Sequence, residues 1–298
     1  MKPIVLAGPT GAGKSEMAIR LAERIGGEII NYDSLQIYRG FDIGTAKPSL
    51  AERNRVPHHL FDIVDADAEF TAADYARIAR PVCDAIARPI LAGGTFFYLR
   101  ALLSGLPEMP ARDPAIRKRI RRILDKRRGA SRLHRWLSRI DPVSGGRIAP
   151  SDRNRVERAL EVWLISGRPI SSFARESSDE MPSLKIALSV DRAELVRRLD
   201  ARVESMYRAG LVDETRALLE TFSRSARPFG SIGYREAAGV IAGELALDAA
   251  IDETRRRTRA YAKRQMTWLR SERNMHWIDA ADRERAFAAA VHLIEENS

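Results

Sequence analysis

The stretch Gly8-Pro9-Thr10-Gly11-Ala12-Gly13-Lys14-Ser15 decides the fold of this chain. It has the spacing Gly-x-x-x-x-Gly-Lys-Ser, and it lies between an apolar run at residues 3–7 and a helical pattern at residues 16–25. In a strand–loop–helix setting, backbone N–H groups and the helix N-terminus point at a phosphate, and the lysine adds a positive charge. The sequence therefore predicts that residues 8–15 bind a di- or triphosphate, with the Ser15 hydroxyl as a ligand of Mg²⁺. The alternative is a glycine-rich turn that binds nothing.

Strand and helix patterns alternate over the first 105 residues. We expect strands at residues 3–7, 28–31, 59–64 and 89–92, and helices at residues 16–25, 71–86 and 96–103. This alternation predicts a parallel sheet with crossover helices, in which ligands bind at the carboxyl ends of the strands. Three segments that follow strands, at Gly8, Asp33 and Thr95, should therefore meet at one edge of the sheet.

The character of the sequence changes after about residue 105. Residues 110–183 have helical patterns broken by glycines, and a strand pattern returns only at residues 185–190. From residue 191 onward the patterns are mostly helical. We therefore expect an α/β fold with a P-loop NTPase-like core and a central parallel sheet, made of residues 1–109 and 184–298. Residues 110–183 would be an inserted all-helical domain.

The positive charge is concentrated in this insert. Residues 109–160 contain 16 Lys and Arg against 5 Asp and Glu, although the net charge of the whole chain is only +10. A local excess of this size favours a polyanionic partner such as nucleic acid. The helical spacing puts Arg155 and Arg158 on one face, and near the C-terminus it puts Arg259, Lys263 and Arg270 on another. The alternative for both helices is a solvated charged face.

The cellular compartment is suggested by what the sequence lacks. Cys83 is the only cysteine, so no intramolecular disulfide can form. No segment is long and apolar enough to span a bilayer, and the first strand pattern starts directly after Lys2. We expect a cytoplasmic protein with no membrane partner.

Three side chains at the predicted strand ends are candidates for chemistry. A carboxylate at Asp33 can take a proton from an attacking hydroxyl or amine, although a helix cap or an Asx turn would explain it equally well. The Gln36 amide can bond an adenine edge bidentately. Thr95 can contact a phosphate oxygen or the reacting centre, or can cap the helix that follows it.

The strand at residues 89–92 is followed by glycine, where many ATPases have a metal-binding carboxylate. Motor-type hydrolysis is therefore disfavoured. Asp62 and Asp65 are the possible substitutes for that carboxylate.

Several of these segments together resemble the bacterial tRNA dimethylallyltransferase family. The two most specific are Asp33-Ser-Leu-Gln-Ile-Tyr38 and Lys263-Arg-Gln-Met-Thr-Trp268. The other matches, in order, are residues 8–15, 42–48, 57–62, 93–102, 113–117, 152–161 and 232–236. The chain departs from the family pattern at Phe96, where glycine is frequent, and at the Gly11-Ala12 pair.

The resemblance implies transfer of a dimethylallyl group from dimethylallyl diphosphate to N6 of adenosine 37. That adenosine lies 3′ of the anticodon in tRNAs that read codons beginning with U. Asp33, Thr95 and Lys14 would be catalytic, and Arg216 would join residues 8–15 and Mg²⁺ in binding the diphosphate. The chain would act as a monomer on the tRNA anticodon stem-loop. The residues implied to contact tRNA are Asp33, Ser34, Leu35, Gln36, Thr95, Arg117, Asn154, Arg155, Val156, Glu157, Arg158, Gly230, Ser231, Ile232, Gly233, Tyr234, Arg235, Lys263, Arg264, Gln265, Trp268 and Arg270.

Three other functions fit parts of the sequence. A small-molecule or nucleoside kinase would need both the phosphate loop and Asp33, and a related enzyme could prenylate free AMP. Neither substrate requires a basic insert. A non-catalytic RNA-binding module would leave the phosphate loop unexplained.

Overall fold

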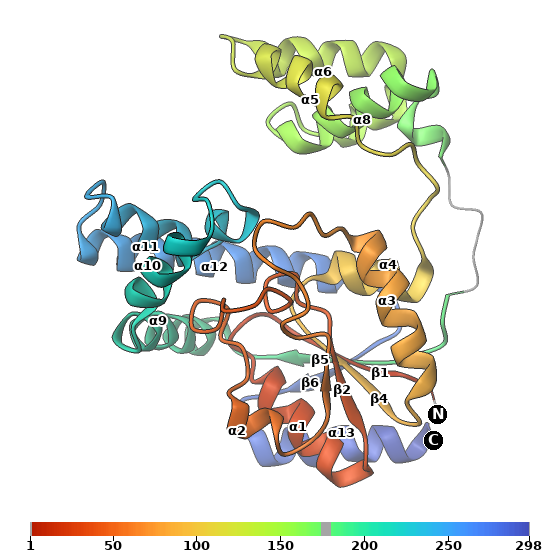
Figure 1. The fold of residues 1–298 in the computed structure, drawn as a ribbon. Coiled ribbons are helices and arrows are strands. Elements are labelled where there is room, and N and C mark those ends of the chain that lie inside the picture. Colours follow the sequence, from red (N-terminus) through yellow and green to blue (C-terminus); the bar gives the residue numbers. More distant parts are fainter. Residues whose placement is uncertain (1, 174–179, 298) are drawn as a thin grey trace. The chain divides into compact units, whose positions relative to one another are not determined.

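The computed structural model describes residues 2–173 and 180–297 of the chain of 298. It divides into two compact units (Figure 1). Unit 1 comprises Met1–Gly105 and Glu180–Ser298, and unit 2 comprises Leu106–Asp179. The boundaries of unit 2 thus fall four residues before each end of the insert expected from the sequence.

A single parallel sheet organises the described residues of unit 1. Its strand order is β3-β2-β4-β1-β5-β6, and all five strand pairs are parallel. The strands are β1 Ile4–Ala7, β2 Glu28–Asn31, β3 His58–His59, β4 Pro89–Ala92, β5 Leu184–Ser189 and β6 Met275–Asp279. The predicted α/β fold with a central parallel sheet is confirmed.

Two strand predictions need correction. The third strand was expected at residues 59–64, but it covers only His58–His59. Leu60 and Asp62 follow with φ angles of 64° and 54°, in the left-handed region that no strand can contain. The edge strand β6 was not expected, because the helical patterns on both sides of Met275–Asp279 dominate that part of the sequence.

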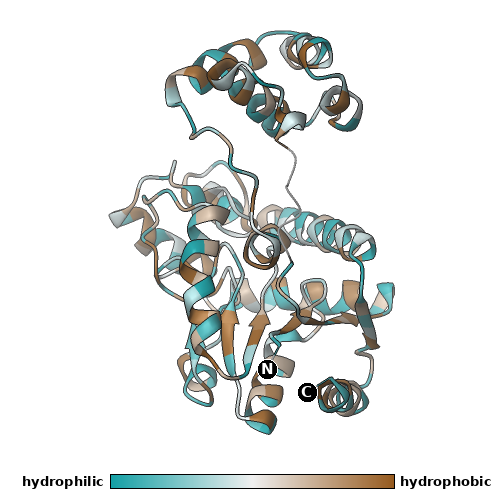
Figure 2. Cartoon of the chain, turned by 90° about the vertical axis from the view of Figure 1, so that its right-hand side faces the viewer, coloured by the Kyte–Doolittle hydropathy of each residue, from teal (hydrophilic) through white to brown (hydrophobic). Residues whose placement is uncertain are grey.

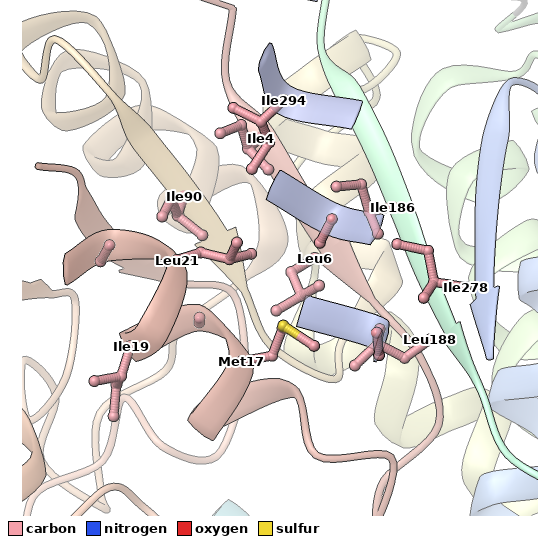
Figure 3. Close-up of a cluster of buried hydrophobic side chains, with 14 of the residues drawn as sticks. Ile4, Leu6, Met17, Ile19, Leu21, Ile90, Ile186, Leu188, Ile278 and Ile294 are labelled. Atoms are coloured by element: carbon pink, nitrogen blue, oxygen red, sulfur yellow. The ribbon is translucent and has the colours of Figure 1, made fainter. Parts of the chain in front are cut away.

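One face of the sheet is covered by α1 (Lys14–Ile25) and α13 (Arg283–Glu296). Met17 and Leu21 of α1 and Ile294 of α13 pack against Leu6 and Ile186 of the strands (Figure 3). Burial of one such side chain contributes about 1.5–3 kcal/mol. This layer therefore fixes α1, and with it the loop at residues 8–13, at the end of β1.

The remaining helices of unit 1 come from both halves of the chain. α3 (Ala72–Ala85) begins at the predicted capping box, in which Thr71 and Asp74 bond each other's backbone N–H. It packs against α4 (Phe96–Ser104). The N-terminal half also contains the short α2 (Leu50–Arg53). The C-terminal half contributes α9 (Arg192–Arg208), α10 (Leu211–Thr221), the 3₁₀ turn η2 (Arg227–Gly230), α11 (Tyr234–Ile241) and α12 (Leu247–Ser271).

The described part of unit 2 is helical throughout. It contains α5 (Pro114–Leu124), α6 (Gly129–Ile140), α7 (Pro142–Arg147), α8 (Arg153–Ser166) and the 3₁₀ turn η1 (Ile170–Ser172). Its own core includes Ile120, Leu133, Leu137 and Leu160. Figure 2 shows hydrophobic residues along the strands of the sheet, whereas hydrophobic and hydrophilic residues alternate along the helices of both units.

Candidate active site

A pocket of about 490 Å³ opens in unit 1 where the loops after β1, β2 and β4 come together. Thr10 and Lys14 line it from the first loop, Asp33 from the second and Thr95 from the third. The prediction that these segments meet at one edge of the sheet is therefore confirmed. Residues of α9 and α12 close the opposite side, namely Arg202, Val203, Met206, Thr254, Thr258, Tyr261 and Gln265.

The loop before α1 has the backbone needed to bind an anion. Gly13, the N-cap of α1, has a φ of 88°, and no atom lies within 4 Å of the place where a Cβ would stand. The ammonium of Lys14 donates hydrogen bonds to the carbonyls of Gly8 and Pro9, at 3.0 and 2.9 Å. The N-terminus of α1 and the Lys14 ammonium therefore lie where an anion in the pocket could bind.

The pKa of Lys14 is lowered to about 8, mainly by burial and in addition by the positive charge of Arg202, although the Asp33 carboxylate acts in the opposite direction. Burial also lowers the pKa of Arg202, again against the attraction of Asp33. The pocket thus brings two cations close enough to repel each other, with one carboxylate beside them. An anion with several negative charges would relieve that repulsion.

Asp33 has one oxygen fixed and the other open. Its Oδ1 accepts a hydrogen bond from the backbone N–H of Leu35 at 2.9 Å, which is an Asx turn. Its Oδ2 has no hydrogen-bond partner within the described part of the chain. A Cβ on Gly94 would stand 2.8 Å from that oxygen, so glycine at this position leaves room for it. The Asx turn and a chemical role are therefore compatible.

Thr95 is the N-cap of α4, but its hydroxyl does not cap that helix. Its Oγ1 accepts from the backbone N–H of Ser34 and donates to the Ser34 hydroxyl, both at 3.0 Å. The loop after β4 is thereby joined to the loop after β2. This link holds Thr95 next to the Asp33 segment.

A helix from the C-terminal half joins the loops after β1 and β4. Gln265 of α12 accepts from the N–H of Thr10 at 2.8 Å and donates to the carbonyl of Gly94 at 2.9 Å. The hydroxyl of Tyr261, one turn earlier, donates to the same carbonyl at 2.9 Å. The geometry of the pocket therefore depends on α12 as much as on the sheet.

Comparison with known proteins identifies the family. The family described as IPP transferase matches residues 36–272, and the one described as isopentenyl transferase matches residues 1–62. A tRNA dimethylallyltransferase from Citrifermentans bemidjiense is 48% identical, covering 99% of this chain and 97% of its own. One from Solibacter usitatus is 51% identical, covering 93% of this chain and 92% of its own. This chain belongs to the tRNA dimethylallyltransferase family.

Solved structures of similar proteins agree with this family assignment. The tRNA isopentenylpyrophosphate transferase of Bacillus halodurans superimposes with a TM-score of 0.71 at 34% identity, covering 99% of this chain and 97% of that one. A eukaryotic dimethylallyltransferase crystallised while acting on tRNA gives a TM-score of 0.81 at 28% identity, covering 99% of this chain and 80% of that one. The fold of the tRNA dimethylallyltransferases therefore extends over both units.

One expected diphosphate ligand needs correction. Arg216 does not line the pocket: it lies on α10 with an exposed side chain, paired with Asp213 at 2.5 Å. The arginine that lines the pocket is Arg202 on α9. The sequence carried a signal for it, because Arg202 stands beside the buried stripe formed by Leu195, Leu199 and Val203.

Gln36 lines the pocket, but it cannot read adenine in the expected way. Its amide nitrogen already donates to the carbonyls of Thr45 and Ala46, at 3.1 and 3.2 Å. A bidentate contact needs both the donor and the acceptor of the amide. This leaves only Oε1 for a ligand.

Several residues that were expected to contact tRNA are instead buried inside the fold. Val156 and Glu157 of α8 are buried, as are Gly233 and Tyr234 next to η2. The Tyr234 hydroxyl donates to Glu214, which accepts from backbone N–H groups at residues 43 and 44.

Two expected tRNA-binding arginines of unit 2 are engaged within that unit. Arg117 and Arg158 both pair with the fully buried Glu161, at 3.0 and 2.7 Å. Arg158 also donates to the carbonyl of Pro110 at 2.7 Å. These two guanidinium groups are therefore held inside the unit.

The other expected contacts are open to a ligand. Gly230, Ser231 and Ile232 line the pocket, as do Ser34 and Leu35. Exposed side chains are those of Asn154, Arg155, Arg235, Lys263, Arg264 and Arg270. Trp268 is half-buried because it stacks on Phe96, with ring centroids 4.4 Å apart and planes 3° from parallel. This stack occupies the position at which the family frequently has glycine.

The carboxylates suggested as substitutes for an ATPase metal ligand are engaged elsewhere. Asp62 pairs with Lys47 and Arg53, both at 2.6 Å, and Asp65 pairs with Arg39 at 2.8 Å. Neither lines the pocket.

No helix within residues 2–173 and 180–297 has the length and apolar character needed to cross a bilayer.

Proposed function

We propose that this enzyme transfers the dimethylallyl group of dimethylallyl diphosphate to N6 of adenosine 37, 3′ of the anticodon in tRNAs reading codons that begin with U, and releases diphosphate. One observation carries the proposal. The open oxygen of Asp33 shares a pocket with two mutually repelling cations, Lys14 and Arg202. A base beside a polyanion site is what displacement of diphosphate by an amine requires.

The diphosphate would bind at the loop of residues 8–15. The N–H groups at the start of α1, the ammonium of Lys14 and the guanidinium of Arg202 all carry positive charge toward that end of the pocket. Their charge offsets the negative charge that develops on the leaving oxygen as the carbon–oxygen bond breaks. The hydroxyl of Thr95 is a further donor within the same pocket.

Magnesium fits the same end of the pocket. Ser15 lines it with an exposed side chain, and its hydroxyl has no hydrogen-bond partner within the described residues. The described residues contain no cluster of three His, Cys, Asp or Glu, and Mg²⁺ bound to a phosphate needs none, since it keeps several waters. Ser15 would hold the ion, which when bound neutralises charge on the diphosphate.

Asp33 would act as the base. The exocyclic amine of adenine is a poor nucleophile, because its lone pair is delocalised into the ring. As the new carbon–nitrogen bond forms, the amine loses a proton, and Oδ2 of Asp33 accepts it. The Asx turn through Oδ1 keeps this oxygen directed at the pocket during the reaction.

The five-carbon tail needs protection from water, because the allylic carbon becomes positive as diphosphate departs. Val203, Met206 and Ile232 provide apolar surface in the pocket. They would hold the tail and exclude water from the reacting carbon.

The tRNA would bind through its anticodon stem-loop. The target adenine must leave its stack to enter the pocket. Arg155 and Asn154 in unit 2 and Lys263, Arg264 and Arg270 on α12 are exposed and can contact phosphates. We assign the tRNA-docking role to unit 2 and a monomeric state to the enzyme.

The direct test uses dimethylallyl diphosphate with a labelled tail, Mg²⁺ and one of three acceptors: unmodified tRNA, the same tRNA with adenosine 37 replaced by guanosine, or free AMP. We expect label only in the first. Label in AMP would favour the free-nucleotide reaction. Transfer of the γ-phosphate from labelled ATP to a nucleoside, without prenyl transfer, would establish a kinase instead.

A further inference from the structure

Phe97 is an exposed aromatic residue next to the site, and nothing in the proposed reaction uses it. It follows Thr95 by two residues, and 58% of its surface is accessible. Its neighbours Phe96, Tyr98 and Leu99 on α4 are buried. Arg100, one turn later, is exposed on the same side of the helix.

Rings and cations of α4 and α12 lie between this end of α4 and the pocket. The guanidinium of Arg100 lies 5.3 Å from the ring centre of Trp268 on α12 and also pairs with Glu272 at 2.6 Å. Arg264, one turn before Trp268, lies 5.7 Å from the ring centre of Tyr261, which lines the pocket. We call Phe97, Arg100, Arg264 and Trp268 the α4–α12 strip.

The charge near this strip suits a nucleic acid. Lys263, Arg264 and Arg270 are exposed and have no carboxylate partner within the described part of the chain. Free cations beside aromatic rings are typical of sites that bind single-stranded RNA, where the cations contact phosphates and the rings stack on bases.

We propose that Phe97 stacks on the base adjacent to the target adenosine in the anticodon loop. The inference rests on the proposed function. When the adenine leaves its stack to enter the pocket, the neighbouring base loses a stacking partner and exposes one face. The Phe97 ring covers that face, while cations of α12 contact the phosphates on either side. Phe97 is thus a positioning residue for RNA, and it does not touch the reacting atoms.

Three variants test the proposal. Phe97→Leu keeps an apolar side chain but removes the ring, and Phe97→Tyr keeps the ring. Leu247→Ala is the control, because Leu247 is also exposed on α12 but lies 17 residues before Arg264, roughly 25 Å along the helix axis. We expect Phe97→Leu to raise the KM for tRNA about tenfold, with little change in the KM for dimethylallyl diphosphate. The tyrosine variant and the control should match the wild type.

A binding measurement separates this inference from the proposed function. Anticodon stem-loops carrying 2-aminopurine on the 5′ or the 3′ side of the target adenosine are titrated with each protein, without dimethylallyl diphosphate. Stacking on Phe97 should quench one of the two probes in the wild type and in Phe97→Tyr, but not in Phe97→Leu. Equal quenching and equal KM in wild type and Phe97→Leu would overturn the role of Phe97. Failure of the wild type to prenylate tRNA would overturn the proposed function, whatever the probes report.

Discussion

The side-chain oxygen of Gln265 accepts a hydrogen bond from the backbone N–H of Thr10 at 2.8 Å, although 255 residues separate the two in the sequence. The amide nitrogen of Gln265 bonds the carbonyl of Gly94. One buried amide on α12 therefore links the loop at residues 8–15 to the loop that carries Thr95.

Replacing Gln265 with Leu should impair both stability and catalysis. The variant leaves the Thr10 N–H and the Gly94 carbonyl without this partner, at a cost of about 1–3 kcal/mol. We expect the free energy of unfolding in urea to fall by that amount, and kcat to fall as well. Thr267→Ala is the control, because the Thr267 hydroxyl bonds only a carbonyl of its own helix. Wild-type stability in Gln265→Leu would show that the two loops do not depend on α12.

Asp33→Asn isolates the chemical role of this residue. Asparagine can still accept the N–H of Leu35 through Oδ1, so the Asx turn and the fold should persist. It cannot accept the proton of the amine. We expect turnover to fall by about 10²- to 10⁴-fold, with tRNA affinity and melting temperature unchanged. Single-turnover prenylation and a filter-binding assay measure the two quantities, and near-normal turnover would refute the assignment of the base.

Arg202 and Arg216 form a matched pair for the diphosphate site. Loss of a charge-assisted hydrogen bond worth about 1.5–3 kcal/mol predicts a drop of about 10- to 150-fold in kcat/KM for dimethylallyl diphosphate in Arg202→Gln. Arg216→Gln, at an exposed arginine outside the pocket, should stay within about twofold of the wild type. The reverse pattern would restore the assignment made from the sequence.

Arg155 and Arg158 separate RNA binding from stability in unit 2. Arg155 is exposed, and its weak pairing with Asp152 at 3.4 Å leaves it available. We expect Arg155→Ala to weaken tRNA binding and to reduce the slope of log affinity against log salt by about 1. Arg158→Ala should instead lower stability by about 1–3 kcal/mol, because it removes a partner of the buried Glu161. An unchanged salt slope in Arg155→Ala would argue against this surface as a docking site.

The lowered pKa of Lys14 predicts a pH limit for ligand binding. In the free enzyme the ammonium loses its proton as the pH rises through about 8, below its ordinary value of 10.5. The affinity for inorganic diphosphate should therefore decline above that pH, by up to about tenfold per unit. Calorimetry at pH 7 and pH 9, with Lys14→Gln to correct for titration of diphosphate itself, measures the effect.

The lowered pKa of Lys14 also determines how this residue changes the free energy of unfolding with pH. Between pH 8 and 10.5 the unfolded chain binds more protons at Lys14 than the folded one, so this residue makes the folded state relatively more stable as the pH rises. In the calorimetry experiment described above, an equal pH dependence of diphosphate binding in the wild type and in Lys14→Gln would contradict the lowered pKa of Lys14.

Much of the fold could be predicted from local sequence patterns. Glu28–Asn31 and Pro89–Ala92 are strands with the predicted bounds, because short apolar runs between turn residues favour buried strands. The capping box at Thr71 was also predicted correctly, because it involves only residues that are close together in the sequence. β6 was missed because it is an edge strand whose pairing with β5 comes from the tertiary structure, not from its own pattern.

The site was less predictable, for a physical reason. The loop at residues 8–15 and Asp33 lie at strand ends that the sequence itself marks. Arg202 lies on a helix whose packing decides which of several arginines faces the pocket, and the resemblance to the family had led to Arg216 instead. Gln36 shows the same limit, because its two backbone partners belong to a loop whose path the sequence does not reveal.

The insertion of unit 2 between β4 and β5 also sets the order in which the sheet can be completed. β1 is synthesised first, but its neighbour β5 follows the 74 residues from 106 to 179. At ordinary translation rates, synthesis of unit 2 alone keeps the edge of β1 without its partner for roughly 4–15 s. Unit 2, built from helices close together in the sequence, can fold in that interval. The nascent chain can therefore reach a stage in which a folded helical unit is attached to an incomplete sheet, whose open apolar strand can pair with other chains.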